Sequence, residues 1–146
     1  MIAHVLASLL LGAGSSPASP LILYDAPPGR AYMEALTGGV LSREGDCVYL
    51  VNGSGRSLLI LPSPRASWNP ARGTIRFGGV ELRFGEEAAF GGGEVGIGRG
   101  PQADAARRRG CDTRRVWWAS PALVRRIPPS RPAPPPPPED SKFPDG

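Results

Sequence analysis

Residues Val40 to Leu61, VLSREGDCVYLVNGSGRSLLIL, decide the expected fold of this 146-residue chain. Two turn runs interrupt the stretch, Glu44-Gly45-Asp46 and Asn52-Gly53-Ser54-Gly55, and such residues tolerate the positive φ angles of tight turns. The runs Cys47–Val51 and Leu58–Leu61 are hydrophobic on both faces of the pleat, which is typical of strands covered on both sides. The stretch therefore predicts a meander of three strands: Val40–Arg43, Cys47–Val51 and Ser57–Leu61.

Further strands are expected on the C-terminal side of this meander: Thr74–Phe77, Val80–Phe84 and Arg115–Ala119. Gly78-Gly79 separates the first two, which is a two-residue hairpin signal. With 20 glycines and 18 prolines, the composition favours short strands joined by tight turns. A meander must close or pack on itself to protect its edges. The expected fold is therefore all-β, either a small five- to six-stranded barrel of OB-like or SH3-like type or a compact sandwich.

The segments between these strands are expected to be mostly irregular. Leu21–Arg30 ends in Pro-Pro-Gly and is interpreted as a linker or an edge strand. Ala31–Thr37 is expected to form one helical turn or the approach to the first strand, broken by the glycines that follow. Pro62–Gly73 and Ala88–Gly100 are rich in proline and in glycine, which predicts surface loops. Ala103–Arg109 is expected to form a brief helix.

Residues 1–18 have the features of a secretory signal peptide. Val5–Ala13 (VLASLLLGA) is an apolar run of suitable length, too short for the roughly 20 residues that span a bilayer. Ser16 and Ala18 fit the small-x-small cleavage pattern. The first four residues carry no Lys or Arg, so a helical extension or a wrongly assigned start is the alternative. We therefore expect an exported protein, secreted or held in the periplasm or cell envelope, without a transmembrane span.

The rest of the chain is expected to divide into three parts. Residues 19–35 are a linker or edge segment, 36–120 a β-barrel-like domain, and 121–146 a disordered proline-rich tail. The run from Pro132 to Pro138 favours polyproline II, which does not pack into a core. Such a segment can dock on an SH3 or WW domain; a spacer or an extension without a function is the favoured interpretation.

The two cysteines, Cys47 and Cys111, belong to no C-x-x-C or Cys/His cluster. The single histidine, His4, lies in the expected signal peptide, so the mature chain lacks the usual ligands of a zinc site. In an exported protein, two cysteines predict one disulfide, which stabilises the fold by about 4 kcal/mol in the chain-entropy model. The alternative is a pair of buried free thiols in a cytosolic protein.

The sequence offers no catalytic constellation. A mature chain without histidine has no Ser/His/Asp arrangement, and Cys47 has no imidazole to activate it. The run Gly91-Gly92-Gly93-Glu94-Val95-Gly96 matches G-x-G-x-x-G, but the βαβ unit that a dinucleotide site requires is not expected here. We therefore expect a non-enzymatic protein without a cofactor or a metal.

Lys142 is the only lysine among the 17 basic residues, so the others are arginine. Arginine forks recognise phosphate and carboxylate, and Arg107–Arg109, Arg114-Arg115 and Arg125-Arg126 flank aromatic residues, as in single-strand nucleic-acid binders. The candidate ligand-stacking residues are Trp68, Trp117 and Trp118. GC-rich codon usage explains the same composition without any anion, so nucleic acid is not the expected partner.

Short motifs of glycine and hydrophobic residues lie at Gly45–Leu50, Leu59–Pro62, Gly78–Val80 and Gly91–Gly93. Together they resemble uncharacterised small exported bacterial β-domain proteins. The resemblance covers about residues 36–119 and implies a barrel-like domain outside the cytoplasm, with no activity and no site residue to carry over. The expected function is a binding or structural module with a cell-envelope component as candidate partner. The alternative is an OB-like single-stranded nucleic-acid-binding protein.

We predict that the chain is cleaved near Ala18, because the small-x-small pattern ends there. Intact-mass measurement of the protein from its native source should give a mature N-terminus at or next to Ser19. A chain that begins at Met1 in the cytosolic fraction would contradict both the cleavage and the export.

Overall fold

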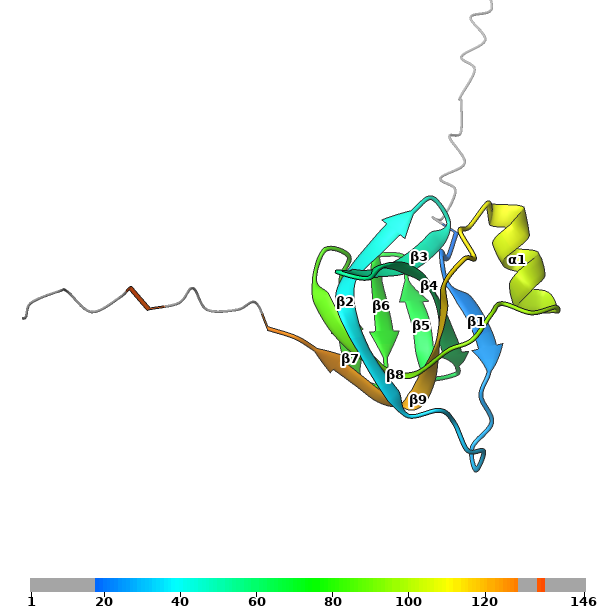
Figure 1. Ribbon diagram of the computed structural model, residues 1–146, viewed down its shortest axis with the longest axis horizontal. Coiled ribbons are helices and arrows are strands. Elements are labelled where there is room, and N and C mark those ends of the chain that lie inside the picture. Colours follow the sequence, from blue (N-terminus) through cyan, green and yellow to red (C-terminus); the bar gives the residue numbers. More distant parts are fainter. Residues whose placement is uncertain (1–17, 129–133, 136–146) are drawn as a thin grey trace, which may run out of the picture.

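In the computed structural model, which describes residues 18–128 and 134–135, the central stretch forms the expected antiparallel meander (Figure 1). Its strands are β2 (Ala35–Glu44), β3 (Cys47–Asn52) and β4 (Gly55–Ser63). Two further strands, β8 (Glu87–Glu94) and β9 (Val116–Arg126), continue the sheet beyond β2. Because β9 also pairs with β4, five strands close into a ring, and the predicted all-β barrel is confirmed.

The ring closes through a parallel pairing. Leu58 and Ile60 of β4 lie opposite Val116 and Trp118 of β9, and the two strands run in the same direction. Around the ring the strands follow the order β2, β3, β4, β9 and β8. If the five barrel strands are numbered 1 to 5 along the chain, this order is 1-2-3-5-4. Adjacent, parallel third and fifth strands are the connectivity of an OB-fold, a Greek-key barrel. Of the predicted alternatives, the OB-like barrel is therefore the one that the chain adopts.

β3 and β4 are buried on both faces, as their apolar runs predict. Their inward side chains join a barrel core with residues of the other strands, among them Leu41, Val48, Leu50, Leu59, Leu61, Phe90 and Trp117. Their outward side chains form a second cluster outside the ring: Cys47, Tyr49, Leu58 and Ile60. Since successive strand residues point to opposite faces, the same two strands contribute to both clusters.

Two elements outside the ring cover the second cluster. β1 (Ile22–Asp25) pairs in parallel with the end of β4 and packs against the helix α1 (Pro101–Arg109) (Figure 1). The helix begins with a proline, ends at the left-handed Gly110, and carries three arginines near the negative end of its dipole. The predicted brief helix and the edge-strand interpretation of this N-terminal segment are both confirmed.

A disulfide between Cys47 and Cys111 ties β3 to the chain directly after α1. The two Cα atoms are 5.7 Å apart, within the range that disulfides adopt. The predicted bond is therefore confirmed. It joins positions that are 64 residues apart, and closing a loop of that length stabilises a fold by about 4 kcal/mol in the chain-entropy model.

A second, three-stranded sheet packs its inner face into the barrel core. Its strands are β5 (Ala66–Asn69), β6 (Thr74–Phe77) and β7 (Val80–Leu82). Phe77 meets Phe90 of β8 edge to face, with ring centroids 6.0 Å apart. The turn between β6 and β7 lies at Gly78-Gly79, so the predicted hairpin is confirmed.

The predicted loop at Pro62–Gly73 is wrong, because it contains the end of β4 and all of β5. Ala66 is buried and Trp68 is partly buried, while Ser67 between them is exposed. This alternation gives β5 one face toward the core. Pro64 and Pro70 lie outside the two ends of β5, where a missing backbone N–H removes no ladder hydrogen bond, and Pro62 is the last residue but one of β4.

The predicted loop at Ala88–Gly100 is also wrong, because β8 occupies its first half. The glycines serve close packing here. At the bulge between β8 and β9, a Cβ on Gly92 would collide with the backbone carbonyl oxygen of Trp118. Only glycine allows the two strands to approach at this point.

β2 and β9 are longer than predicted. β2 begins at Ala35, so Ala31–Thr37 contains the approach to a strand and no helical turn. β9 continues to Arg126, which lies opposite Ala88 of β8. The domain therefore extends past its predicted end at residue 120, because β8 supplies pairing partners that a loop would not.

Most of the predicted signal peptide and of the proline-rich tail lies outside the described residues. Within the described part of the chain, no helix is long and apolar enough to cross a membrane.

Gly92→Ala should lower the free energy of unfolding by more than about 2 kcal/mol, because Gly92 has a φ of 141° and an added Cβ would collide with β9. Gly96→Ala is the matched control from the same glycine-rich run, since a Cβ there meets no atom within 4 Å. Its effect should stay within about 0.5 kcal/mol. Equal stability of the two variants in denaturant unfolding would contradict the close approach of β8 and β9.

Candidate functional site

β4 runs between β1 and β9 near Ile60. This residue pairs with Trp118 of β9 along one edge of β4 and with Ile22 of β1 along the other. On the outside of the barrel, β1, β4 and β9 therefore lie side by side, and we call this place the β1–β4–β9 junction. The Tyr24 hydroxyl of β1 donates a hydrogen bond across β4 to the Ala119 carbonyl oxygen of β9 at 2.6 Å.

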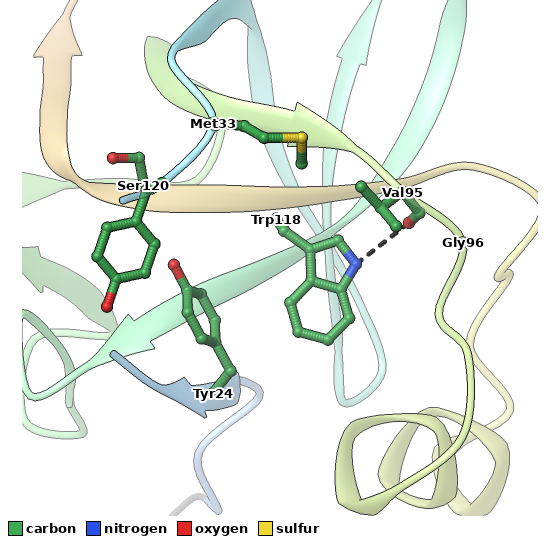
Figure 2. A pocket seen from close by; sticks show the side chains of 8 residues that line it. Tyr24, Met33, Val95, Gly96, Trp118 and Ser120 are labelled. Carbon is green, nitrogen blue, oxygen red and sulfur yellow. Dashed lines mark hydrogen bonds between the residues drawn. The ribbon is translucent and has the colours of Figure 1, made fainter. Parts of the chain in front are cut away.

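A pocket of about 280 Å³ lies at this junction (Figure 2). The rings of Tyr24 and Trp118 meet edge to face, with centroids 5.5 Å apart. The Trp118 indole N–H donates to the Val95 carbonyl oxygen at 3.1 Å, the bond drawn dashed in Figure 2. Both rings are only partly buried, so they present apolar surface to the solvent in a fixed orientation.

The segment between β1 and β2 supplies another wall of this pocket. Tyr32 and Met33 line it, and the Tyr32 hydroxyl donates to the Pro27 carbonyl oxygen at 2.8 Å. The Met33 side chain lies against Gly93 of β8, where an added Cβ would collide with the thioether. Glycine at position 93 therefore leaves the space that Met33 occupies.

A second pocket of about 500 Å³ adjoins the first. Tyr32 lines both, and Ser120 of the first pocket precedes Pro121 of the second. The second pocket is lined largely by prolines and two arginines: Pro27, Pro28, Pro64, Pro121, Arg30 and Arg65. We call the two pockets together the aromatic groove.

Apart from the guanidinium groups of Arg30 and Arg65, the polar side-chain atoms of the aromatic groove are few and engaged. Burial, and to a lesser degree the neighbouring Tyr32, raises the pKa of Tyr24 to about 12, so its hydroxyl stays protonated at neutral pH. Ser120 is buried, and its hydroxyl accepts the N–H of Ala122 at 3.2 Å. Among the described lining residues there is no histidine, cysteine or carboxylate. The ring and proline surface of the groove is therefore suited to binding an apolar ligand.

Residues 18–128 and 134–135 contain no group of three or more His, Cys, Asp or Glu side chains that could hold a metal ion.

Of the three candidate stacking residues, Trp118 lies in the aromatic groove and the other two do not. Trp117 points into the barrel core, where its indole N–H donates to a β8 carbonyl oxygen at 3.4 Å. Trp68 packs against Phe84, with ring centroids 6.0 Å apart, and the Arg43 guanidinium lies 5.3 Å from its ring. The structure does not bring the three tryptophans together.

Sequence reasoning missed Tyr24, Tyr32 and Met33 as site residues. All three lie in the segment 19–35, whose pattern predicts only a linker or an edge strand. The available signal was the pair of tyrosines on either side of the Pro-Pro-Gly turn, which places aromatic rings near a rigid bend.

Arginines near the C-terminal end of α1 are ion-paired rather than gathered on an open basic face. Arg56 and Arg114 share Asp112, with N–O distances of 3.2 and 2.7 Å, and Arg115 pairs with Glu94 at 3.0 Å. Hydrogen bonds from Arg114 and, more weakly, Arg56 hold the pKa of Asp112 well below its usual range. Exposed pairs of this kind stabilise a fold little, but they engage guanidinium groups that a phosphate-binding face would need.

Comparisons of the chain with protein-family profiles, with curated proteins and with solved structures find no match. The candidate site therefore rests on its geometry, and the resemblance to small exported bacterial β-domain proteins stays a prediction.

Tyr24 should make the stability of the fold depend on alkaline pH. Its pKa of about 12 in the folded chain lies above the ordinary value of 10.0, so the unfolded chain loses this proton first as pH rises. The contribution of Tyr24 to the free energy of unfolding should be constant below pH 10 and should fall between pH 10 and pH 12.

Denaturant unfolding of the wild type and of Tyr24→Phe over this pH range measures the effect. The decrease in the free energy of unfolding that Tyr24 causes between pH 10 and pH 12 should be absent in the variant. An unchanged slope in Tyr24→Phe would contradict the burial of this phenol at the β1–β4–β9 junction.

Proposed function

We propose that this chain is an exported, non-enzymatic binding module whose aromatic groove holds an extended, proline-rich peptide. The observation that carries the proposal is the open Tyr24–Trp118 ring pair beside a pocket lined with prolines. Export is supported by the signal-peptide features of residues 1–18 and by the Cys47–Cys111 disulfide, since disulfides persist at cell surfaces and in the periplasm.

A peptide in the polyproline II conformation matches the chemistry of the aromatic groove. Such a peptide has three residues per turn and no internal hydrogen bonds, so its prolyl rings face outward in a fixed repeat. Aromatic-lined grooves bind it because the preformed helix loses little conformational entropy. Tyr24 and Trp118 offer ring surface to one prolyl residue, and Tyr32, which lines both pockets, offers it to the next turn.

The alternative function, binding of single-stranded nucleic acid, is disfavoured by the cover on the barrel. OB-folds bind oligonucleotides on the face of their second and third strands, which here are β3 and β4. The outward residues Tyr49 and Ile60 of these strands are 2% and 0% exposed and belong to the cluster beneath α1 and β1. Bases stack on exposed rings, and the disulfide holds the helix over this face.

An oligoproline peptide should bind the full chain, and Trp118→Ala and Tyr32→Ala should each weaken binding at least about tenfold, or about 1.4 kcal/mol, because each removes a ring of the groove. Leu36→Ala is the matched control, since Leu36 is 60% exposed and lines neither pocket. Isothermal titration calorimetry measures the affinities.

Equal affinity of Trp118→Ala and the wild type would remove the aromatic groove as the binding site. A single-stranded oligonucleotide serves as a second probe, for which no salt-sensitive binding is expected. A dissociation constant below about 1 μM that rises with added salt would instead favour the nucleic-acid alternative.

A further inference from the structure

The second pocket of the aromatic groove carries two arginines, Arg30 and Arg65. Both are exposed, and within the described part of the chain neither has an ion-pair partner, whereas Arg72 pairs with Glu81 at 2.8 Å and Arg126 with Glu86 at 3.2 Å. No carboxylate is among the described lining residues of this pocket. A ligand that complements it therefore combines prolines with negative charge.

The chain itself contains a segment of that composition. Pro132 and Ala133 precede the unbroken run Pro134–Pro138, and Glu139-Asp140 follow directly. The run favours polyproline II. Carboxylates next to it are suited to charge-assisted, bidentate hydrogen bonds with guanidinium groups.

Resting on the proposed function, we infer that the aromatic groove binds the segment Pro132–Asp140 of a second copy of this chain. The prolines cover the rings of the groove, and Glu139 and Asp140 lie against Arg30 and Arg65. Apolar contact supplies the attraction, and the charge pairing sets the direction of the segment in the groove.

The course of β9 indicates that the segment reaches the groove of a second copy more easily than the groove of its own copy. β9 leaves the groove and runs to Arg126, which lies opposite Ala88 at the far end of β8. At about 3.4 Å per residue, this part of the strand carries the chain about 20 Å away. Residues 127–131 would then have to fold straight back, although Pro128 and Pro129 among them favour continued extension.

Each copy then has one groove and one segment, so the contact joins copies head to tail, in a ring or an open chain. A segment of nine residues, Pro132–Asp140, buries a small area. Contacts at the low end of the interface size range are weak and transient. The association should therefore be reversible and should depend on chain concentration.

Sedimentation velocity of the full chain over a range of concentrations tests the inference. The sedimentation coefficient should rise with concentration, and an excess of free peptide with the sequence of residues 130–146 should reverse the rise. Glu139→Gln combined with Asp140→Asn should weaken association at least about fivefold, as should Arg30→Ala combined with Arg65→Ala. Asp145→Asn is the matched control, because it removes a carboxylate outside the segment.

Oligoproline binding to the same proteins separates this inference from the proposed function. If oligoproline binds but the chain stays monomeric, or if the acidic double variant associates like the wild type, the contact between copies is overturned and the proposed function stands. If deletion of residues 129–146 strengthens oligoproline binding to a monomeric chain, the segment occupies its own groove, which also overturns the contact between copies. If oligoproline does not bind and the chain does not associate, both are overturned.

Discussion

Strand β4 pairs with three neighbours, β3 and then β1 along one edge and β9 along the other. Its apolar run Leu58–Leu61 is at most 1% exposed, and its side chains alternate between the barrel core and the cluster beneath α1. Pairing with β9 closes the ring, and pairing with β1 on the opposite edge places Tyr24 beside Trp118. Closure of the barrel, the second cluster and the aromatic groove therefore all depend on the two hydrogen-bonding edges of this one strand.

Because the outward face of β3 and β4 is apolar, its burial requires a covering layer. α1 has nine residues, which is short for a helix that is stable alone in water. It is held by the burial of Ala103 and Ala106 and by the Cys47–Cys111 disulfide. The roughly 4 kcal/mol of such a bond is a large part of the 5–15 kcal/mol that stabilises a typical domain. The same layer closes the usual ligand face of an OB-fold, while the Tyr24–Trp118 ring pair at the β1–β4–β9 junction stays partly open.

The features that could be predicted from the sequence have local signals: alternating apolar runs, turn residues, and two cysteines in a chain with export features. β8 could not be predicted, because Gly92 and Gly93 look like loop residues until their distant packing partners are known. The aromatic groove could not be predicted either, because its residues are brought together only by distant strand pairing. Tyr24, Tyr32 and Trp118 come from separate segments, and only the shared pairing of β1 and β9 with β4 brings them together. Of these three residues only Trp118 was a candidate, together with Trp117 and Trp68; one of two adjacent tryptophans on a strand must face outward, but the sequence does not say which one.

The rings of the aromatic groove are fixed before a ligand arrives. The hydroxyls of Tyr24 and Tyr32 and the indole N–H of Trp118 each donate to a backbone carbonyl, at 2.6, 2.8 and 3.1 Å. Immobilising a free side chain on binding costs about 0.5–1.5 kcal/mol, and rings that are already held avoid most of that cost. The same three bonds engage the donors of the rings, so the rings contribute affinity through the surface that a ligand covers, and Arg30 and Arg65 are the groove donors left to bind acceptor groups. A groove of this kind selects a ligand that is itself stiff and poor in donors. Proline meets both demands, because its ring fixes the backbone and removes the N–H.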